Sequence, residues 1–136
     1  MRFQFLPPLI ILALAFFAVW AATPARAEDD PFQNYLYNTC LETESYWIGK
    51  DPKAVEANCD CKAKTEEKLA DPAFKQAVME QKPYEKFPFG DPASYQAQIL
   101  TACPKLRPLM IDAVCNDPAA PKSACDDIKK MVKGLK

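Results

Sequence analysis

The chain of 136 residues contains no histidine and only three glycines. Without histidine, the Ser–His and Cys–His pairs that activate a nucleophile are excluded. The glycines, at positions 49, 90 and 134, are too scattered to form the Gly-rich loop that binds phosphate groups. No segment alternates apolar and polar residues, so we expect no β-sheet. These absences exclude the common nucleophilic and phosphate-binding enzyme classes.

The first 27 residues have the three parts of a secretory signal peptide. Arg2 supplies the positive charge, residues 6–22 form an uncharged and mostly apolar run, and Ala25-Arg26-Ala27 has the small-x-small form of a cleavage site. Cleavage is therefore expected before Glu28. The alternative is an uncleaved membrane anchor, but a run of 17 residues is at the lower edge of a membrane span.

Residues 28–136 would form the mature protein, a single domain of 109 residues. Without Arg2 and Arg26, 15 basic and 18 acidic side chains remain, which gives a net charge of −3. Nucleic-acid binding needs a basic surface, so we expect no nucleic-acid partner. No comparable apolar run follows the signal, so we expect no membrane contact after cleavage. The expected location is the periplasm or the extracellular medium.

Six cysteines in an exported chain of this size predict three structural disulfides. The helices on either side of residues 49–51 are expected to pack antiparallel, which would place Cys40 opposite either Cys59 or Cys61. The same geometry about residue 120 places Cys115 opposite Cys125. The preferred pairs are Cys40–Cys61, Cys59–Cys103 and Cys115–Cys125.

The Cys59-Asp60-Cys61 segment also permits an alternative, namely thiol-redox exchange or soft-metal binding. Reactive thiols usually lie near a positive charge or a helix N-terminus, whereas Asp60 would disfavour a thiolate. Soft-metal sites commonly combine cysteine with histidine, which this chain lacks. We therefore expect no metal site and no cofactor, and the thiol-redox or metal-handling function is the second hypothesis.

The dipeptide Asp-Pro occurs five times, and its first four copies are 21, 20 and 20 residues apart. Aspartate caps the free N–H groups of a first helical turn, and proline fits the first helical position. We prefer repeated use of one cap to an internal repeat, because the intervening segments share little else. The predicted helices are 31–48, 52–70, 72–82, 92–103, 108–115 and a last one that begins at a Ser123/Asp126 capping box.

Most charged residues are expected to lie on solvated helix faces. In the second predicted helix this applies to Lys62, Lys64, Glu66, Glu67 and Lys68. The neighbouring carboxylates do not predict an acid–base pair, because adjacent helical residues diverge and catalysis needs converging carboxylates. These pairs are Glu42/Glu44, Glu66/Glu67 and Asp126/Asp127. We therefore expect no catalytic residues, and an enzyme that uses carboxylate catalysis is the third hypothesis.

The segment 82–90 contains two prolines and a glycine and is predicted to be a loop. It carries Tyr84, Phe87 and Phe89 among the charged residues Lys82, Glu85 and Lys86. Aromatic side chains on a stiff loop are good interface anchors. The three aromatic residues are therefore the candidate interface. The alternative is that their rings cover a small core.

Together these patterns predict an all-α, disulfide-stapled bundle of about five to six helices. The expected function is that of a non-catalytic, exported binding or structural protein. Its expected partner is an unidentified envelope or secreted protein. In size, compartment and disulfide-braced helices the chain is similar to periplasmic immunity proteins that neutralise secreted toxins. This similarity carries no sequence motif and assigns no residues.

Overall fold

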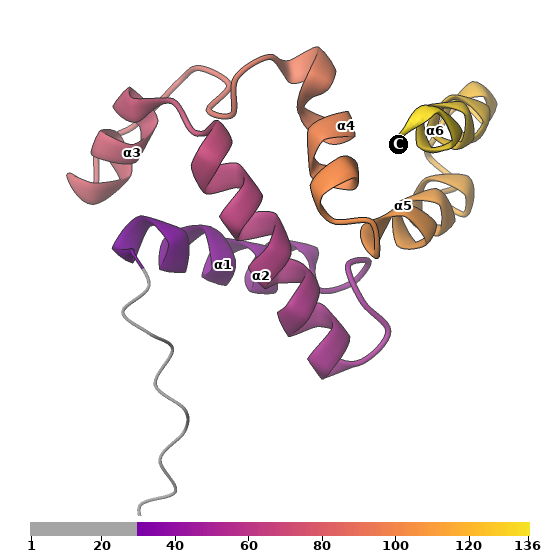
Figure 1. Ribbon diagram of the computed structural model, residues 1–136, viewed down its shortest axis with the longest axis horizontal. Helices are drawn as coiled ribbons and strands as arrows, with labels where there is room; N and C mark the ends of the chain where they lie inside the picture. The colour runs from indigo at the N-terminus through magenta and orange to yellow at the C-terminus, as the bar shows by residue number, and fades with distance from the viewer. Residues whose placement is uncertain (1–29) are drawn as a thin grey trace, which may run out of the picture.

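The computed structural model describes residues 30–136, which form six α-helices and no strand (Figure 1). The helices are α1 (Pro31–Glu44), α2 (Pro52–Leu69), α3 (Pro72–Met79), α4 (Pro92–Ala102), α5 (Leu106–Cys115) and α6 (Lys122–Gly134). The predicted all-helical, disulfide-braced fold is confirmed. The predicted signal peptide and its cleavage site lie outside the described residues.

Four of the five Asp-Pro pairs begin helices, as predicted. In each, a carboxylate oxygen of the aspartate accepts a hydrogen bond from a backbone N–H group in the first turn. The four bonds are Phe32 N to Asp30 (2.9 Å), Ala54 N to Asp51 (3.0 Å), Ala73 N to Asp71 (2.8 Å) and Ala93 N to Asp91 (3.1 Å). Asp117 accepts from the N–H of Ala119 at 2.8 Å, but it forms a turn between α5 and α6 and begins no helix.

Four predicted helix boundaries are wrong. The first helix ends at Glu44 and residues 45–48 continue as a turn, which buries Ile48 fully. The third helix ends at Met79 and not at residue 82, and Gln81 has a φ of 55°, outside the helical region. α5 begins two residues before Pro108, because proline is tolerated anywhere in a first turn, where its N–H group has no helical partner. The last helix begins at Lys122 without a side-chain cap, so the predicted Ser123/Asp126 capping box does not form.

Gly49 lets the segment between α1 and α2 pass close to the start of α2. A Cβ atom at this position would lie 2.6 Å from the backbone nitrogen of Val55 and 2.9 Å from its Cγ2. Any larger residue would therefore displace the connection from α2.

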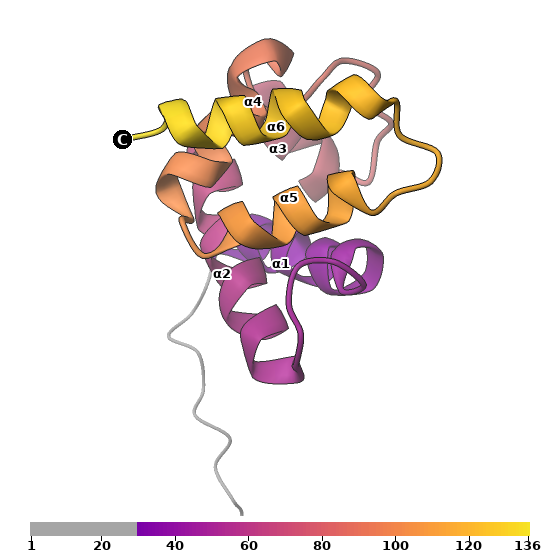
Figure 2. The ribbon, with the colours of Figure 1, turned by 90° about the vertical axis from the view of Figure 1, so that its right-hand side faces the viewer.

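The helices form an elongated arrangement with α3 at one end and α6 at the other (Figure 1). α1 and α2 cross and make the most extensive contact, and α4 packs against α2. α5 and α6 lie side by side as a helical hairpin, which the perpendicular view shows clearly (Figure 2). Among residues 30–136, no helix has the length and apolar character needed to span a membrane.

Two groups of buried side chains hold these helices together. The larger group joins all helices except α3, and its fully buried members include Ile48, Leu100 and Leu106. The smaller group contains Phe32, Leu36 and Ala63, with Phe74 from α3 and Phe89 packed against it. The N-terminal end of α1 is also tied to α3, because Lys75 Nζ donates to the Asp30 carboxylate at 2.6 Å.

All six cysteines form disulfides, but only one of the three predicted pairs is correct. Cys115 pairs with Cys125 as predicted. The other two bonds are Cys40–Cys59 and Cys61–Cys103, so the predicted pairs Cys40–Cys61 and Cys59–Cys103 are wrong. Cys59 is fully buried on the face of α2 that meets α1, whereas Cys61 points around the helix toward α4. One helix is thus bridged on two sides.

Candidate functional site

The aromatic loop, residues 82–90, folds back partly onto the smaller core group. Phe74 lies 5.3 Å from the ring of Tyr84 and 5.6 Å from that of Phe89, measured between centroids. The N–H of Asp71 donates to the carbonyl of Pro88 at 2.8 Å. The backbone N–H of Ala73 and the Tyr84 hydroxyl both donate to the Asp71 carboxylate. These hydrogen bonds, with that from Ala73 the stronger cause, keep the pKa of Asp71 below its usual range. Two of the three candidate interface residues therefore also act as anchors of the loop.

Phe87 is the most exposed of the three aromatic residues, with 40% of its surface accessible. Its ring lies 6.0 Å from Phe89 and 5.3 Å from Tyr95 of α4, in edge-to-face geometry with both. Phe89 in turn stacks on Tyr95 at 5.4 Å. The loop therefore presents Phe87 to solvent from a fixed position above α4.

Tyr95 also contacts a buried cluster of charged groups that the sequence analysis placed in solvent. The Nζ atom of Lys62 lies 2.5 Å from Glu66 Oε1 and 2.8 Å from Glu44 Oε1. The Tyr95 hydroxyl donates to the same oxygen of Glu66. Lys62 is 8% exposed and Glu66 is 3% exposed, so the prediction that both are solvated is wrong. We call Glu44, Lys62, Glu66 and Tyr95 the buried charge cluster.

The cluster stabilises the proton-bearing forms of Lys62 and Tyr95. Burial lowers the pKa of Lys62, but the charges of Glu66 and Glu44 and the hydrogen bonds to them outweigh burial and raise it. Burial and the neighbouring charge of Glu66 both raise the pKa of the Tyr95 hydroxyl. At neutral pH Lys62 is therefore an ammonium and Tyr95 an un-ionised phenol.

This ionisation pattern predicts that the protein loses stability in alkali. The ordinary pKa values are 10.5 for Lys62 and 10.0 for Tyr95, and both are higher in the folded state. Their contribution is complete below these values and is lost as the pH rises, by about 1.4 kcal/mol per pH unit for each group. Denaturant unfolding between about pH 7 and pH 11 measures the decline. Tyr95→Phe should make it shallower, and an equally steep decline in that variant would contradict the assignment.

Three members of the buried charge cluster, Glu44, Lys62 and Tyr95, line a concavity of about 360 Å³. We call it the ionic pocket. Gln96 adds a fourth polar side chain, and Trp47, Leu100 and Met110 are among its apolar lining residues. A mostly apolar pocket with a few converging polar groups of perturbed pKa is the usual form of a ligand site. The ionic pocket is therefore the best candidate for small-molecule binding.

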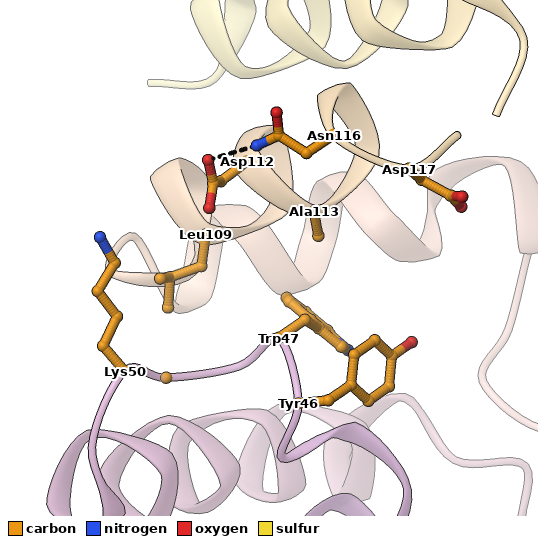
Figure 3. Close-up of a pocket in the computed structure, with 9 residues that line it drawn as sticks. Tyr46, Trp47, Lys50, Leu109, Asp112, Ala113, Asn116 and Asp117 are labelled. Carbon is orange, nitrogen blue, oxygen red and sulfur yellow. Dashed lines mark hydrogen bonds between the residues drawn. The ribbon is translucent and has the colours of Figure 1, made fainter. Parts of the chain in front are cut away.

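A second concavity of about 350 Å³ lies between the α1–α2 connection and α5 (Figure 3). Tyr46 and Trp47 line it from the connection, and Asp112 accepts a hydrogen bond from the Asn116 side chain at 2.8 Å. Trp47 lines both concavities. The charged groups of the second one, including Lys50 and Asp112, are exposed, and solvent therefore screens them. It is the weaker candidate.

The structure gives no support to a dithiol at Cys59 and Cys61. Each is bonded to a different distant cysteine, and the residues described include no free cysteine. Within residues 30–136, no group of three or more histidine, cysteine or acidic residues is placed to hold a metal ion.

Residue type alone did not predict the buried charge cluster, because charged side chains are usually exposed. The positions themselves carried a signal. Lys62, Ala63 and Glu66 follow Cys59 by three, four and seven residues, which puts all of them on one helical face. Because Cys59 was expected to be buried in a disulfide, Lys62 and Glu66 on the same helical face should have been expected to be buried too. Their spacing of four also predicts an ion pair.

Comparisons of the chain with known protein families, with curated proteins and with solved structures find no match.

Proposed function

We propose that the protein is a non-catalytic, exported binding protein that acts by contact with another protein of the envelope or the extracellular medium. Three disulfides and the signal-like N-terminal sequence support a location outside the reducing cytoplasm. The aromatic loop supplies the contact surface. Phe87 is its central anchor.

The observation that carries this proposal is the fixed exposure of Phe87. A large apolar side chain on a flexible loop would lose entropy on binding, whereas Phe87 is already positioned by Phe89 and Tyr95. Lys82, Glu85 and Lys86 are exposed around it. An apolar anchor within a polar rim is the common anatomy of a protein interface.

Site-specific photo-crosslinking in the exporting host tests the proposal. A photoreactive phenylalanine analogue replaces Phe87, and a control protein carries it at Asn38, an exposed position on α1. We expect position 87 to give a discrete adduct with one protein, and the control position to give none. Equal labelling at the two positions, or no adduct at position 87, would contradict an interface at the loop.

Alanine substitutions should separate the anchoring and presenting roles of the loop. Phe89→Ala removes ring contacts with Phe74 and Tyr95 and is expected to cost about 2 kcal/mol of unfolding free energy. Phe87→Ala removes a more exposed ring and should cost less than about 1 kcal/mol. Denaturant unfolding followed by circular dichroism measures both. If Phe87→Ala destabilises the protein as much as Phe89→Ala, the Phe87 ring covers the core and is not an interface anchor.

A further inference from the structure

We propose that the ionic pocket binds a small organic cation, an ammonium group on an apolar body. This goes beyond the proposed contact with a protein, since the pocket is a separate concavity formed where α2, α4 and α5 meet the end of α1. The cation would lie beside Glu44. Its apolar part would lie against Trp47 and Met110.

The charge balance of the buried charge cluster favours a positive ligand. Lys62 is the one ammonium shared by Glu44 and Glu66, so the cluster carries a net charge of −1. Glu66 accepts from both Lys62 and Tyr95, whereas Lys62 is the ionic partner of Glu44 within residues 30–136. The Glu44 side chain is also the most accessible of the three ionised groups, at 23%. The excess negative charge therefore lies at Glu44, on the surface of the pocket.

The walls of the pocket suit the rest of such a ligand. Trp47 and Tyr95 present aromatic surfaces, which attract organic cations through their π-electrons. Ile99, Leu100 and Met110 add apolar surface. A volume of about 360 Å³ is at the small end of the range for ligand pockets, so it fits a compact molecule.

Other classes of ligand fit less well. An anion would have to compete with two carboxylates for Lys62, which already lies within 2.8 Å of both. A divalent metal ion such as Ca²⁺ needs about six to eight oxygen ligands, and the adjacent ammonium would repel it. An uncharged ligand would leave the net charge of the cluster unbalanced.

Calorimetric titration with three ligands of similar shape tests the proposal on the disulfide-bonded protein. The probes are phenethylamine, 2-phenylethanol and 3-phenylpropanoate, which are a cation, a neutral molecule and an anion at neutral pH. We expect phenethylamine to bind about tenfold more tightly than the alcohol, the effect of one charge-assisted hydrogen bond. The carboxylate should bind least.

Two glutamine variants on the same helix identify the group responsible. Glu44→Gln removes the accessible carboxylate. The affinity of this variant for phenethylamine should fall to about its affinity for 2-phenylethanol. Glu42→Gln removes an exposed carboxylate that does not line the pocket, and it should change nothing. Circular dichroism of both variants verifies that they are folded.

Chemical shifts in NMR spectra locate the bound cation. Met110 lines the ionic pocket and not the second concavity, whereas Ala113 lines the second concavity and not the ionic pocket. Their methyl signals therefore distinguish the two binding places. We expect phenethylamine to shift the Met110 signal and not that of Ala113. Equal affinity for the three probes, no binding of phenethylamine, an unchanged preference in Glu44→Gln, or a shift confined to Ala113 would each overturn the proposal.

Discussion

Reduction of the three disulfides is expected to unfold the protein. In the chain-entropy description, a bond stabilises by restricting the unfolded chain, and its effect grows with the loop that it closes. The loops correspond to sequence separations of 10, 19 and 42 residues. These give about 2.7, 3.2 and 3.9 kcal/mol, a total near the whole stability of an ordinary domain. Little net stability should therefore remain in the reduced protein.

Denaturant unfolding with and without a reducing agent measures this loss. Paired alanine substitutions then rank the bonds. Removal of Cys61 and Cys103 should cost about 1 kcal/mol more than removal of Cys115 and Cys125, which close the shortest loop. A reduced protein that unfolds at the same denaturant concentration as the oxidised one would refute a structural role for the bonds.

Lys62→Met is expected to destabilise the protein strongly. It leaves the Glu66 carboxylate, 3% exposed, without its ammonium partner. Removal of one member of a buried ion pair typically costs about 3–5 kcal/mol, because an uncompensated charge stays buried. The methionine side chain is close to lysine in size, so the effect reports charge more than packing. Chemical denaturation at neutral pH measures it.

Lys64→Met is the matched control, two residues further along the same helix. Lys64 pairs with Asp60 at 2.8 Å, but its side chain is 56% exposed, so the loss should stay below about 1 kcal/mol. A second variant replaces three members of the cluster by apolar groups, with Lys62→Met, Glu66→Leu and Tyr95→Phe together, and keeps the more accessible Glu44. It should regain most of the stability lost in Lys62→Met alone. Similar costs for Lys62→Met and Lys64→Met would show that the buried pair contributes little.

Local chemistry made the helix starts predictable from the sequence. At Asp30, Asp51, Asp71 and Asp91 the capping group and the following proline are adjacent in the chain, so no distant contact is needed to specify them. Asp117 shows the limit of this rule. Its carboxylate makes the same kind of bond to the N–H group two residues on, but the following residues turn and do not continue as a helix.

The buried charge cluster could not be predicted by residue type, because its stability depends on partners from three elements. Lys62 is accommodated only where Glu44 from α1 and Glu66 from α2 approach together, and Tyr95 from α4 completes the hydrogen bonds. The same omission affected the disulfides. With Lys62 and Glu66 assigned to solvent, nothing else in the sequence identified the face of α2 that meets α1. The choice between Cys59 and Cys61 then had no physical basis.

The bond between Cys61 and Cys103 encloses α3 and the aromatic loop in a covalent ring. Lys82 and Lys86 lie exposed within this ring, in a segment without regular secondary structure. Such segments are the preferred places of proteolytic attack. A trypsin-like protease that cuts after Lys86 would open the ring, whereas Pro83 protects the bond after Lys82. The two pieces would remain joined through sulfur. The nicked protein would migrate as one chain until a reducing agent separates it, so a cut in this loop need not release any part of the molecule.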